Sequence, residues 1–398
     1  MAGLLDGIRV IDLTQGIAGP YCAKLLAGLG ADVIKVEPPA GDGTRRNSPF
    51  VHGDSHPEKS IPFLYLNTGK RGVTLDLEAP QASGLLRELA GSADVIIETL
   101  RPDQRAGLGL TYDSLAAVNP RLVVTAITPF GLTGPYAGYL GSEIVVQALT
   151  GHMAITGEPA REPLQIGGNL AEYVAGQTAF VGTMFALYHA LATGQGQEVD
   201  SPVNEAFLDI LDGEAIIALN GEPRSRLGNS TADSFLKGRG GLYECADGWI
   251  ALGQTPGGWD TFADMVGDDR LRDPAFAEPA GRQARKAEIE PIVEQWVHDH
   301  TKLEIYVASQ ERRNVCGFVA TPEDLLQSPH LRARDYFVQV DHPVAGSAEY
   351  AGPPFRAAGH EWCSTRAPLL GEHNPDIYGD LLGMSPQAIE HLRKDGVI

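Results

Sequence analysis

The sequence is short of basic residues. Lys and Arg together number 31, against 51 Asp and Glu, so the formal net charge of the 398-residue chain is −20. A chain this acidic is poorly suited to bind nucleic acid or an anionic membrane surface through charge. We therefore expect no nucleic acid and no membrane among its partners, and any anionic ligand must be held by local basic groups or helix N-termini.

Cysteine is also scarce, and the few cysteines are scattered. The four of them, Cys22, Cys245, Cys316 and Cys363, form no Cys-x-x-Cys pair. This spacing excludes a zinc ribbon and a disulfide framework, and buried free thiols in a reducing compartment are the expectation. We predict no metal site.

Long, purely apolar runs are missing as well. The most apolar long stretch, residues 170–192, carries Glu172, Gln177 and His189, which favours a core helix over a membrane span. No basic segment precedes an apolar one at the start of the chain, so we expect no signal peptide. A cytoplasmic location follows as the expectation.

The first half of the chain alternates β-branched runs with helical patterns. The expected strands cover residues 8–13, 31–37, 72–77, 93–100 and 122–130, and the expected helices cover residues 19–30, 80–92 and 112–119. This rhythm predicts an α/β fold with a doubly wound parallel sheet.

The second half follows a different pattern. A long helix is expected after Gly167 and ends in the glycines of residues 193–197. Residues 220–234 are polar and resemble a linker, and residues 241–253 predict a hairpin. The tail is expected to hold irregular Pro-rich pieces and a last helix at 385–396.

These patterns predict two domains. The large one comprises residues 1–210 and 331–398, and a smaller α+β domain comprises residues 225–330.

The turn after the first expected strand, residues 14–20 (TQGIAGP), invites comparison with dinucleotide-binding folds. Their fingerprint is G-x-G-x-x-G, in which the middle glycine lets the backbone approach a pyrophosphate. Only Gly16-x-x-Gly19 is present here, so nicotinamide or flavin binding is not expected. The turn still lies at the carboxyl end of a strand, where ligands of open α/β sheets bind.

Other polar residues carry weaker signals. Lys70 and Arg71 precede an expected strand and either meet phosphates or are solvated loop charges. His152 has no metal-ligand partner at the right spacing and no nucleophile motif nearby, which favours a structural histidine.

Glu172 has two interpretations that the spacing does not separate. Asn169 and Glu172 fit an N-cap followed by an acidic residue at N3, so Glu172 is either part of a capping box or a nucleophile. A carboxylate at a helix N-terminus can attack an electrophilic carbonyl while nearby backbone N–H groups hold the oxyanion.

Several ordered stretches together resemble the class III CoA-transferases, the CaiB/BaiF family, which includes formyl-CoA and carnitine CoA-transferases. They include residues 4–42, NTGKRGVTLDL (67–77), ADVIIETLRP (93–102), ITPFGLTGPYA (127–137), ATGQGQEVD (192–200), DGWIALG (247–253) and SPHLRARDYF (328–337). The resemblance covers most of the chain.

The resemblance implies a Rossmann-like large domain, a smaller second domain, and two chains interlocked as a dimer. It also implies transfer of CoA from an acyl-CoA to a carboxylic acid, with CoA as a substrate and no permanently bound cofactor. The family's catalytic aspartate attacks the thioester, and a mixed anhydride and an enzyme-bound CoA thioester follow. The matching residue here is Glu172, which implies a glutamyl-CoA thioester.

Some positions depart from the family pattern and remove basic groups that would meet CoA. Gly107 stands where an arginine is usual, Pro38 and Pro39 replace another, and Glu78 replaces a lysine. The remaining candidates for CoA contacts are Gln15, Gly16, Ile17, Ala18, Leu75, Thr99, Leu100 and Arg105.

Two alternatives stay open within the resemblance. One is a non-catalytic subunit of a heteromeric transferase, as in benzylsuccinate CoA-transferase, where a paralogous partner carries the aspartate. The other is an acyl-CoA racemase, which is less favoured because Ser142 occupies the position of the family's second acid/base, a histidine.

Overall fold

The computed structural model describes residues 3–211, 213, 219–221, 226, 228–229, 241–253 and 258–398. The chain forms two compact units. The first comprises Met1–His152, Ile166–Ala215 and Ala333–Ile398, and the second comprises Met153–Gln165 and Ile216–Arg332. Most of the predicted linker at 220–234 lies outside the described residues.

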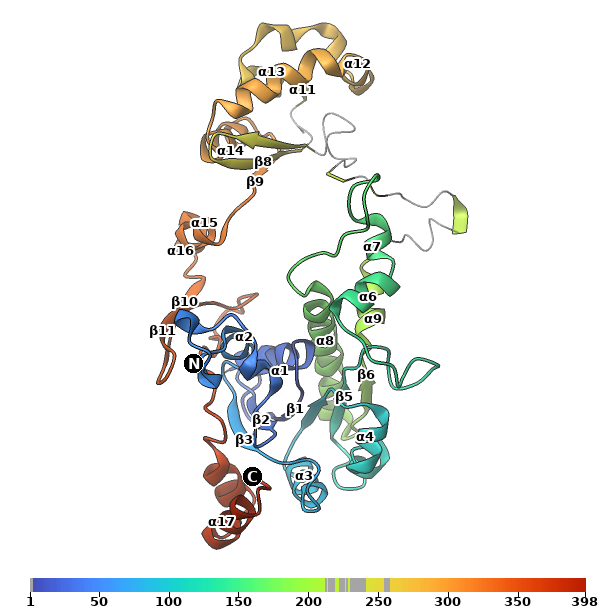
Figure 1. The fold of residues 1–398 in the computed structure, drawn as a ribbon, viewed down its shortest axis with the longest axis vertical. Coiled ribbons are helices and arrows are strands. Elements are labelled where there is room, and N and C mark those ends of the chain that lie inside the picture. The colour runs from blue at the N-terminus through green and yellow to red at the C-terminus, as the bar shows by residue number, and fades with distance from the viewer. Residues whose placement is uncertain are drawn as a thin grey trace. The chain divides into compact units, whose positions relative to one another are not determined.

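A six-stranded parallel sheet lies in the first unit (Figure 1). Its order is β3-β2-β1-β4-β5-β6, and all neighbouring strands pair in parallel. The strands are β1 (Arg9–Leu13), β2 (Asp32–Glu37), β3 (Arg71–Thr74), β4 (Val95–Glu98), β5 (Val123–Ala126) and β6 (Glu198–Asp200). The predicted parallel sheet is confirmed, and β6 is a sixth strand that the sequence pattern did not predict.

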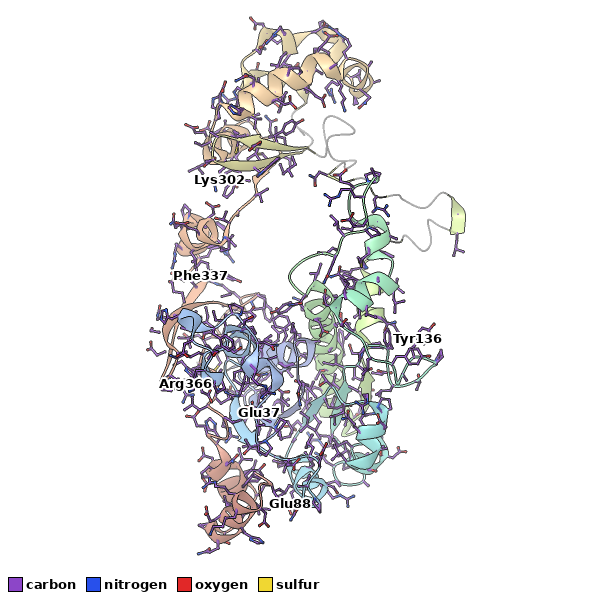
Figure 2. All side chains as sticks on the ribbon, in the orientation of Figure 1. Glu37, Glu88, Tyr136, Lys302, Phe337 and Arg366 are labelled. Atoms are coloured by element: carbon purple, nitrogen blue, oxygen red, sulfur yellow. The ribbon has the colours of Figure 1, made fainter. Side chains whose placement is uncertain are left out.

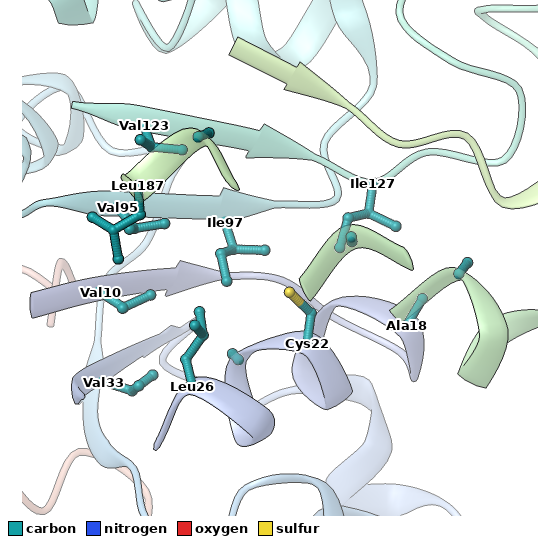
Figure 3. Packing of buried hydrophobic residues seen from close by; sticks show 14 of the residues in the cluster. Val10, Ala18, Cys22, Leu26, Val33, Val95, Ile97, Val123, Ile127 and Leu187 are labelled. Atoms are coloured by element: carbon teal, nitrogen blue, oxygen red, sulfur yellow. The ribbon is translucent and has the colours of Figure 1, made fainter. Parts of the chain in front are cut away.

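Helices cover both faces of this sheet. Val10 points to one face, where it packs with α1 (Ala18–Gly28) and α8 (Leu170–Thr193), as Figure 3 shows. The next residue, Ile11, points to the other face and packs with α3 (Ala82–Gly91), α5 (Tyr112–Ala116) and α17 (Pro386–Lys394). The alternation along a strand therefore builds two cores, as a doubly wound fold requires.

The C-terminal segment is more regular than expected. The predicted irregular tail contains an antiparallel hairpin of β10 (Phe337–His342) and β11 (Gly346–Ala351), followed by a π-helical segment (Pro375–Leu381). The expectation of irregular structure is wrong for the hairpin. The exposed residues of its strands are mostly polar, so the sequence shows little of the apolar alternation that would indicate strands. The predicted last helix is confirmed as α17.

Shorter elements connect these parts. They are the 3-10 turns Gly43–Arg46, Val51–Gly53 and Pro57–Lys59, and the helices α2 (Ile61–Leu66), α4 (Pro102–Gly107), α6 (Glu143–Leu149), α7 (His152–Ile155) and α9 (Val203–Asp209).

The second unit contains a three-stranded antiparallel sheet. The predicted hairpin is confirmed as β7 (Leu242–Cys245) and β8 (Gly248–Leu252), and β9 (Cys316–Phe318) pairs with β8. Its helices are α11 (Trp259–Val266), α12 (Pro279–Ala284), α13 (Lys286–His298), α14 (Lys302–Glu311), α15 (Pro322–Gln327) and α16 (Pro329–Ala333), and its 3-10 turns are Asp269–Arg272 and Pro274–Phe276. The last residue of α16, Ala333, already belongs to the first unit.

Buried ion pairs lie at the carboxyl ends of β1 and β2. Lys70 donates to Asp12 at 2.8 Å, and both side chains are wholly buried. Arg45 donates to Glu37, which is labelled in Figure 2, at 2.7 Å. The first pair ties the segment that enters β3 to β1, and the second ties the loop after β2 to the end of β2.

We expect Lys70→Met to lower the free energy of unfolding by about 3–5 kcal/mol, because it leaves the Asp12 carboxylate buried without its partner. Urea unfolding followed by circular dichroism measures the loss. Lys59→Met is the matched control, since its partner Asp54 is exposed and such a pair contributes about 1 kcal/mol or less. Equal, small losses in both variants would show that the buried pair has no such role.

Candidate active site

The candidate site lies where the strand order of the sheet reverses, between β1 and β4. From β1 the chain continues to β2 on one side, and from β4 it continues to β5 on the other side. The two connections therefore separate at this point, and ligands of open α/β sheets bind in the resulting crevice. The backbone N–H of Gln15, after β1, donates to the Thr99 hydroxyl, after β4, at 3.0 Å. Two of the predicted CoA contacts therefore lie side by side at this point.

Buried polar groups fix the turn after β1. The Thr14 backbone N–H and hydroxyl both donate to Asp12, and Lys35 donates to the Thr14 carbonyl at 2.8 Å. Gly16 has a φ of +81°, and a Cβ on Gly19 would come within 2.4 Å of the Thr14 side chain. The two glycines thus let the chain turn tightly from β1 into α1.

Glu172 lies in the first turn of α8, where α8 crosses the N-terminus of α1. The two helices approach so closely that a Cβ on Gly176 would lie 2.6 Å from the Ala18 carbonyl oxygen. Next to Glu172, the Tyr173 ring packs edge-on against Tyr21 with 4.9 Å between ring centroids. The close crossing brings the half-buried Glu172 side chain to the first turn of α1.

The capping box, one of the two interpretations of Asn169 and Glu172, is not formed. Asn169 has a left-handed backbone with φ of 54° and makes no side-chain cap. The Glu172 carboxylate instead accepts a hydrogen bond from the backbone N–H of Ala18 at 3.3 Å. The side chain is therefore directed to another helix and not to its own.

Glu143, at the start of α6, takes the capping role for α8. Its two carboxylate oxygens accept the backbone N–H groups of Ala171 at 2.9 Å and Glu172 at 3.1 Å. Gln147, one turn later, donates to Glu143 and also bonds both the N–H and the carbonyl of Ile166. The pattern of an acid and an amide four residues apart is visible in the sequence, but nothing in it indicates a partner helix about 28 residues away.

The surroundings of Glu172 favour its neutral form. Burial raises the pKa of the carboxyl group, the nearby charge of Glu143 raises it further, and the hydrogen bond from Ala18 opposes the rise. The ionised form is therefore more basic than that of an exposed glutamate.

A cavity of about 560 Å³ lies beside this crossing. Ile17, Asn169 and Tyr173 form part of its wall, and they are direct or close chain neighbours of Ala18 and Glu172. The rest of the wall comes from the loop after β2 and from α2: Thr44, Arg46, Asn47, Ser48, Pro49, Ile61, Pro62, Tyr65 and Leu66. No local sequence pattern indicates this cavity, because its walls come from four separate segments.

Arg105, a predicted CoA contact, is buried and already paired. Its guanidinium binds Glu98 at 2.6 Å and Glu198 at 2.5 Å. Burial raises the pKa of Glu98 to about 7, although the charge of Arg105 opposes the rise. Arg105 would have to leave one of these carboxylates to bind a phosphate, and its role towards CoA stays a prediction.

The other predicted contacts differ in access. Gln15 and Gly16 are exposed and Ile17 is half-buried, whereas Leu75 is wholly buried in the sheet core. Leu100 is half-buried, and its backbone N–H is bonded to Glu98.

The sequence predicts that Lys70 and Arg71 are either phosphate contacts or solvated loop charges, and neither interpretation describes the contacts that they make. Lys70 is buried and bonds Asp12, the Pro20 carbonyl and Asn67, so it is neither a solvated loop charge nor free for a phosphate. Arg71 forms a two-pronged ion pair with Asp32.

His152 has the setting of a structural histidine. It is buried, its ring stacks on Phe207 with 3.8 Å between centroids, and its Nδ1 lies 3.1 Å from the Thr150 hydroxyl. No cluster of three or more His, Cys, Asp or Glu side chains suited to a metal ion occurs among the described residues. None of the helices in the described part of the chain has the length and apolar character needed to cross a membrane.

Comparison with known proteins places the chain in a family. The model of CoA-transferase family III matches residues 5–374. The succinyl-CoA:(R)-benzylsuccinate CoA-transferase subunit BbsE of Thauera aromatica is 34% identical over 98% of this chain and 97% of its own length. Formyl-CoA:oxalate CoA-transferase of Streptomyces avermitilis is 31% identical and covers 100% of both chains.

A solved structure agrees with these relatives. The crystal structure of a CAIB/BAIF family protein from Brucella suis matches with a TM-score of 0.85 at 29% identity, covering 96% of this chain and 100% of that one. The resemblance seen in the sequence motifs is thereby confirmed, and the chain belongs to CoA-transferase family III, the CaiB/BaiF family.

Proposed function

We propose that this chain transfers CoA from an acyl-CoA to a carboxylic acid and that Glu172 is its nucleophile. The observation that carries the proposal is the direction of the Glu172 side chain. Glu143 caps α8, so the Glu172 carboxylate is not needed for its own helix and lies at the N-terminus of α1 beside the cavity. Relatives whose names describe CoA transfer between acids support the reaction class.

The reaction starts with attack of the Glu172 carboxylate on the thioester carbonyl. The carbon–sulfur bond breaks, CoA leaves as a thiolate, and a mixed anhydride remains. The thiolate then attacks the glutamyl carbonyl, which releases the donor acid and forms a glutamyl-CoA thioester. The acceptor acid attacks that thioester, and the returning thiolate takes the acceptor's acyl group, which regenerates the Glu172 carboxylate.

Backbone N–H groups assist these steps electrostatically. The Ala18 N–H lies 3.3 Å from the Glu172 carboxylate and can hold an oxygen of the glutamyl group while charge develops on it. CoA binds in the crevice at the exposed Gln15–Gly16 turn and Thr99. Ile17 and Leu100, their chain neighbours, belong to the same crevice. CoA is a substrate in this scheme, and no permanently bound cofactor is involved.

Trapping tests the nucleophile directly. Incubation with a panel of acyl-CoA donors, including succinyl-CoA, followed by hydroxylamine, should give a hydroxamate at Glu172 in the digested peptide. Glu172→Gln should give no hydroxamate and lower kcat at least ~1000-fold, because it removes the nucleophile. Glu172→Asp should lower kcat by ~100-fold, since a displacement near 1 Å has effects of that size.

Glu88→Gln is the matched control, because Glu88 is an exposed helical glutamate on α3 (Figure 2). It should retain full activity. A hydroxamate at another residue, or transfer that survives Glu172→Gln, contradicts the assignment.

The raised pKa of Glu172 leads to a pH dependence. We expect kcat/KM to fall as the pH drops through a pKa above 4.5, because only the carboxylate attacks. Glu143→Gln removes a charge that raises this pKa, so the acid limb of the profile should move to lower pH. An unmoved limb would show that another group controls it.

The same shift predicts a stability effect that does not depend on activity. The folded chain holds the Glu172 proton to higher pH than the unfolded chain does, so ionisation lowers stability as the pH rises through the folded pKa. Glu172→Gln should therefore raise Tm at neutral pH, and the gain should shrink as the pH falls towards 4.5. Calorimetric scans across this range measure both changes.

A second candidate function is a non-catalytic subunit of a heteromeric transferase. The observations that favour it are the 34% identity to a relative named as a subunit and the pairing of Arg105 with two carboxylates. It predicts no hydroxamate with any donor and no CoA binding by calorimetry. It also predicts that activity appears only with a paralogous chain that carries aspartate at this position.

We further propose that α8 contacts a second copy of this chain in an interlocked dimer. Val181, Phe185, Tyr188 and Leu191 follow one another at helical spacing and are about half to three-quarters exposed. A contiguous apolar face of this kind on a soluble unit indicates a protein contact.

Light scattering should give about twice the chain mass of 42.4 kDa. Phe185→Asp with Tyr188→Asp should disrupt the assembly, whereas Ser83→Asp, at an exposed position of α3, should not. A monomer that assembles only with a paralogous chain would replace the second copy with that partner.

A further inference from the structure

The turn that follows β4 is held by a buried glutamate. Glu98 is the last residue of β4 and has no exposed surface. One of its carboxylate oxygens accepts the Leu100 backbone N–H at 2.5 Å. The hydroxyl of Thr99, which lies between these two residues in the chain, accepts the Gln15 N–H. Glu98 therefore holds the backbone of one of the two turns that meet at the crevice.

Arg105 contacts the second oxygen of the same carboxylate. Its Nε lies 2.6 Å from that oxygen in an ion pair that is shielded from water on both sides. α4 begins at Pro102, directly after the turn, and carries Arg105 in its last part. The two oxygens of Glu98 thus connect the backbone of the turn to the helix that follows it.

The charges buried at this point do not balance. Arg105 also pairs with Glu198, the first residue of β6, at 2.5 Å, so one cation serves two carboxylates. Leu13 of β1 and Ala126 of β5, the partners of Glu98 in register across the sheet, carry no charge. The charged groups that act on Glu98 are therefore Arg105 from α4 and Glu198 from β6.

A proton on Glu98 weakens this arrangement. Each oxygen of the carboxylate already faces an N–H group, so protonation of either oxygen weakens one of the two contacts. Burial raises the pKa of Glu98 to about 7, and the charge of Glu198 adds to the rise. Arg105 and the Leu100 N–H oppose it. The turn is therefore held by both contacts only above about this pH.

We propose that Glu98 is a positioning residue for CoA, whose ionised carboxylate sets the Thr99–Leu100 turn in the conformation that CoA requires. Glu98 is buried and acts through the Leu100 backbone without touching the ligand. Arg105 serves Glu98 in this assignment, since its guanidinium is directed to buried carboxylates and not to a phosphate. The inference rests on the proposed function, which has CoA bound at this crevice.

The assignment couples CoA binding to the ionisation of Glu98. An apparent Kd increases as the fraction of binding-competent protein falls, so it should rise up to ~10-fold for each pH unit below the pKa of Glu98. The phosphates of CoA also titrate, near pH ~6. Their contribution is the same for every variant of the chain, so a comparison of variants removes it.

Calorimetric titration of the full chain with CoA, on both sides of the Glu98 pKa of about 7, measures this coupling. Glu98→Gln keeps the size of the side chain but only one acceptor. It should bind CoA ~10-fold more weakly than the native chain at the alkaline end, with no pH dependence beyond that of the phosphates. Glu198→Gln removes a charge that raises the Glu98 pKa, so the midpoint should move to lower pH. Arg105→Gln should move it to higher pH.

Asp103→Asn is the matched control, because Asp103 is an exposed carboxylate on the same helix. It removes one negative charge close to the crevice and should keep the native pH profile. The proposal is overturned if the native chain and Glu98→Gln give the same profile, or if Glu198→Gln leaves the midpoint where it is.

Hydrogen exchange tests the turn in the chain without ligand. The Leu100 amide should be more protected above the pKa of Glu98 than below it, relative to the exchange rate of an unstructured peptide at each pH. Glu98→Gln should remove this difference. Equal protection in the native chain and the variant would show that Glu98 does not hold the turn.

The outcomes separate this inference from the nucleophile. A CoA affinity that follows the ionisation of Glu98, without a hydroxamate at Glu172, supports the positioning residue and contradicts the nucleophile. A hydroxamate at Glu172 with an affinity that is independent of Glu98 overturns this inference alone. A native chain that binds no CoA overturns both and favours the non-catalytic subunit.

Discussion

The site depends on three ion pairs that are buried where β1 and β2 leave the sheet. Asp12 with Lys70, Lys35 with Asp42, and Glu37 with Arg45 are each almost completely removed from water. Buried pairs of this kind often add little net stability, because desolvation offsets their attraction. Their contribution here is positional. The Asp12 pair joins β1 to the segment that enters β3, and the other two pairs join β2 to the loop that carries Arg46, so these segments are fixed to one edge of the sheet.

The crossing of α1 and α8 adds a second constraint. Gly176 lets the helices approach closely enough for Glu172 to reach the Ala18 N–H, and Glu143 supplies the cap that α8 then lacks. Two carboxylates thus lie near each other in a half-buried setting, which favours a proton on Glu172 and works against stability at neutral pH. Proteins commonly tolerate such unfavourable arrangements where a reactive group has to be kept basic and accessible.

The sequence predicts the sheet well because its signals are local. Short β-branched runs and the helices between them identify five strands, whereas β6 has only three residues with no buried side chain. The site is less predictable for the opposite reason. Glu172 and the turn after β1 are recognisable by motif, but the cap from Glu143 and the pairing of Arg105 with Glu198 join residues about 30 and 90 positions apart. Such partners depend on how helices cross, which no local pattern contains.

The resemblance implies an aspartate where this chain has Glu172, and this geometry gives the difference a physical meaning. One additional methylene moves the carboxylate by about 1.5 Å, and here it extends from α8 towards the N-terminus of α1. The longer side chain brings the carboxylate within hydrogen-bond distance of the Ala18 N–H, next to Ile17 in the chain. A shorter side chain would withdraw it from the Ala18 N–H unless α8 moved closer, and the contact at Gly176 leaves no room for that movement. In this chain the glutamate therefore fits the separation of the two helices.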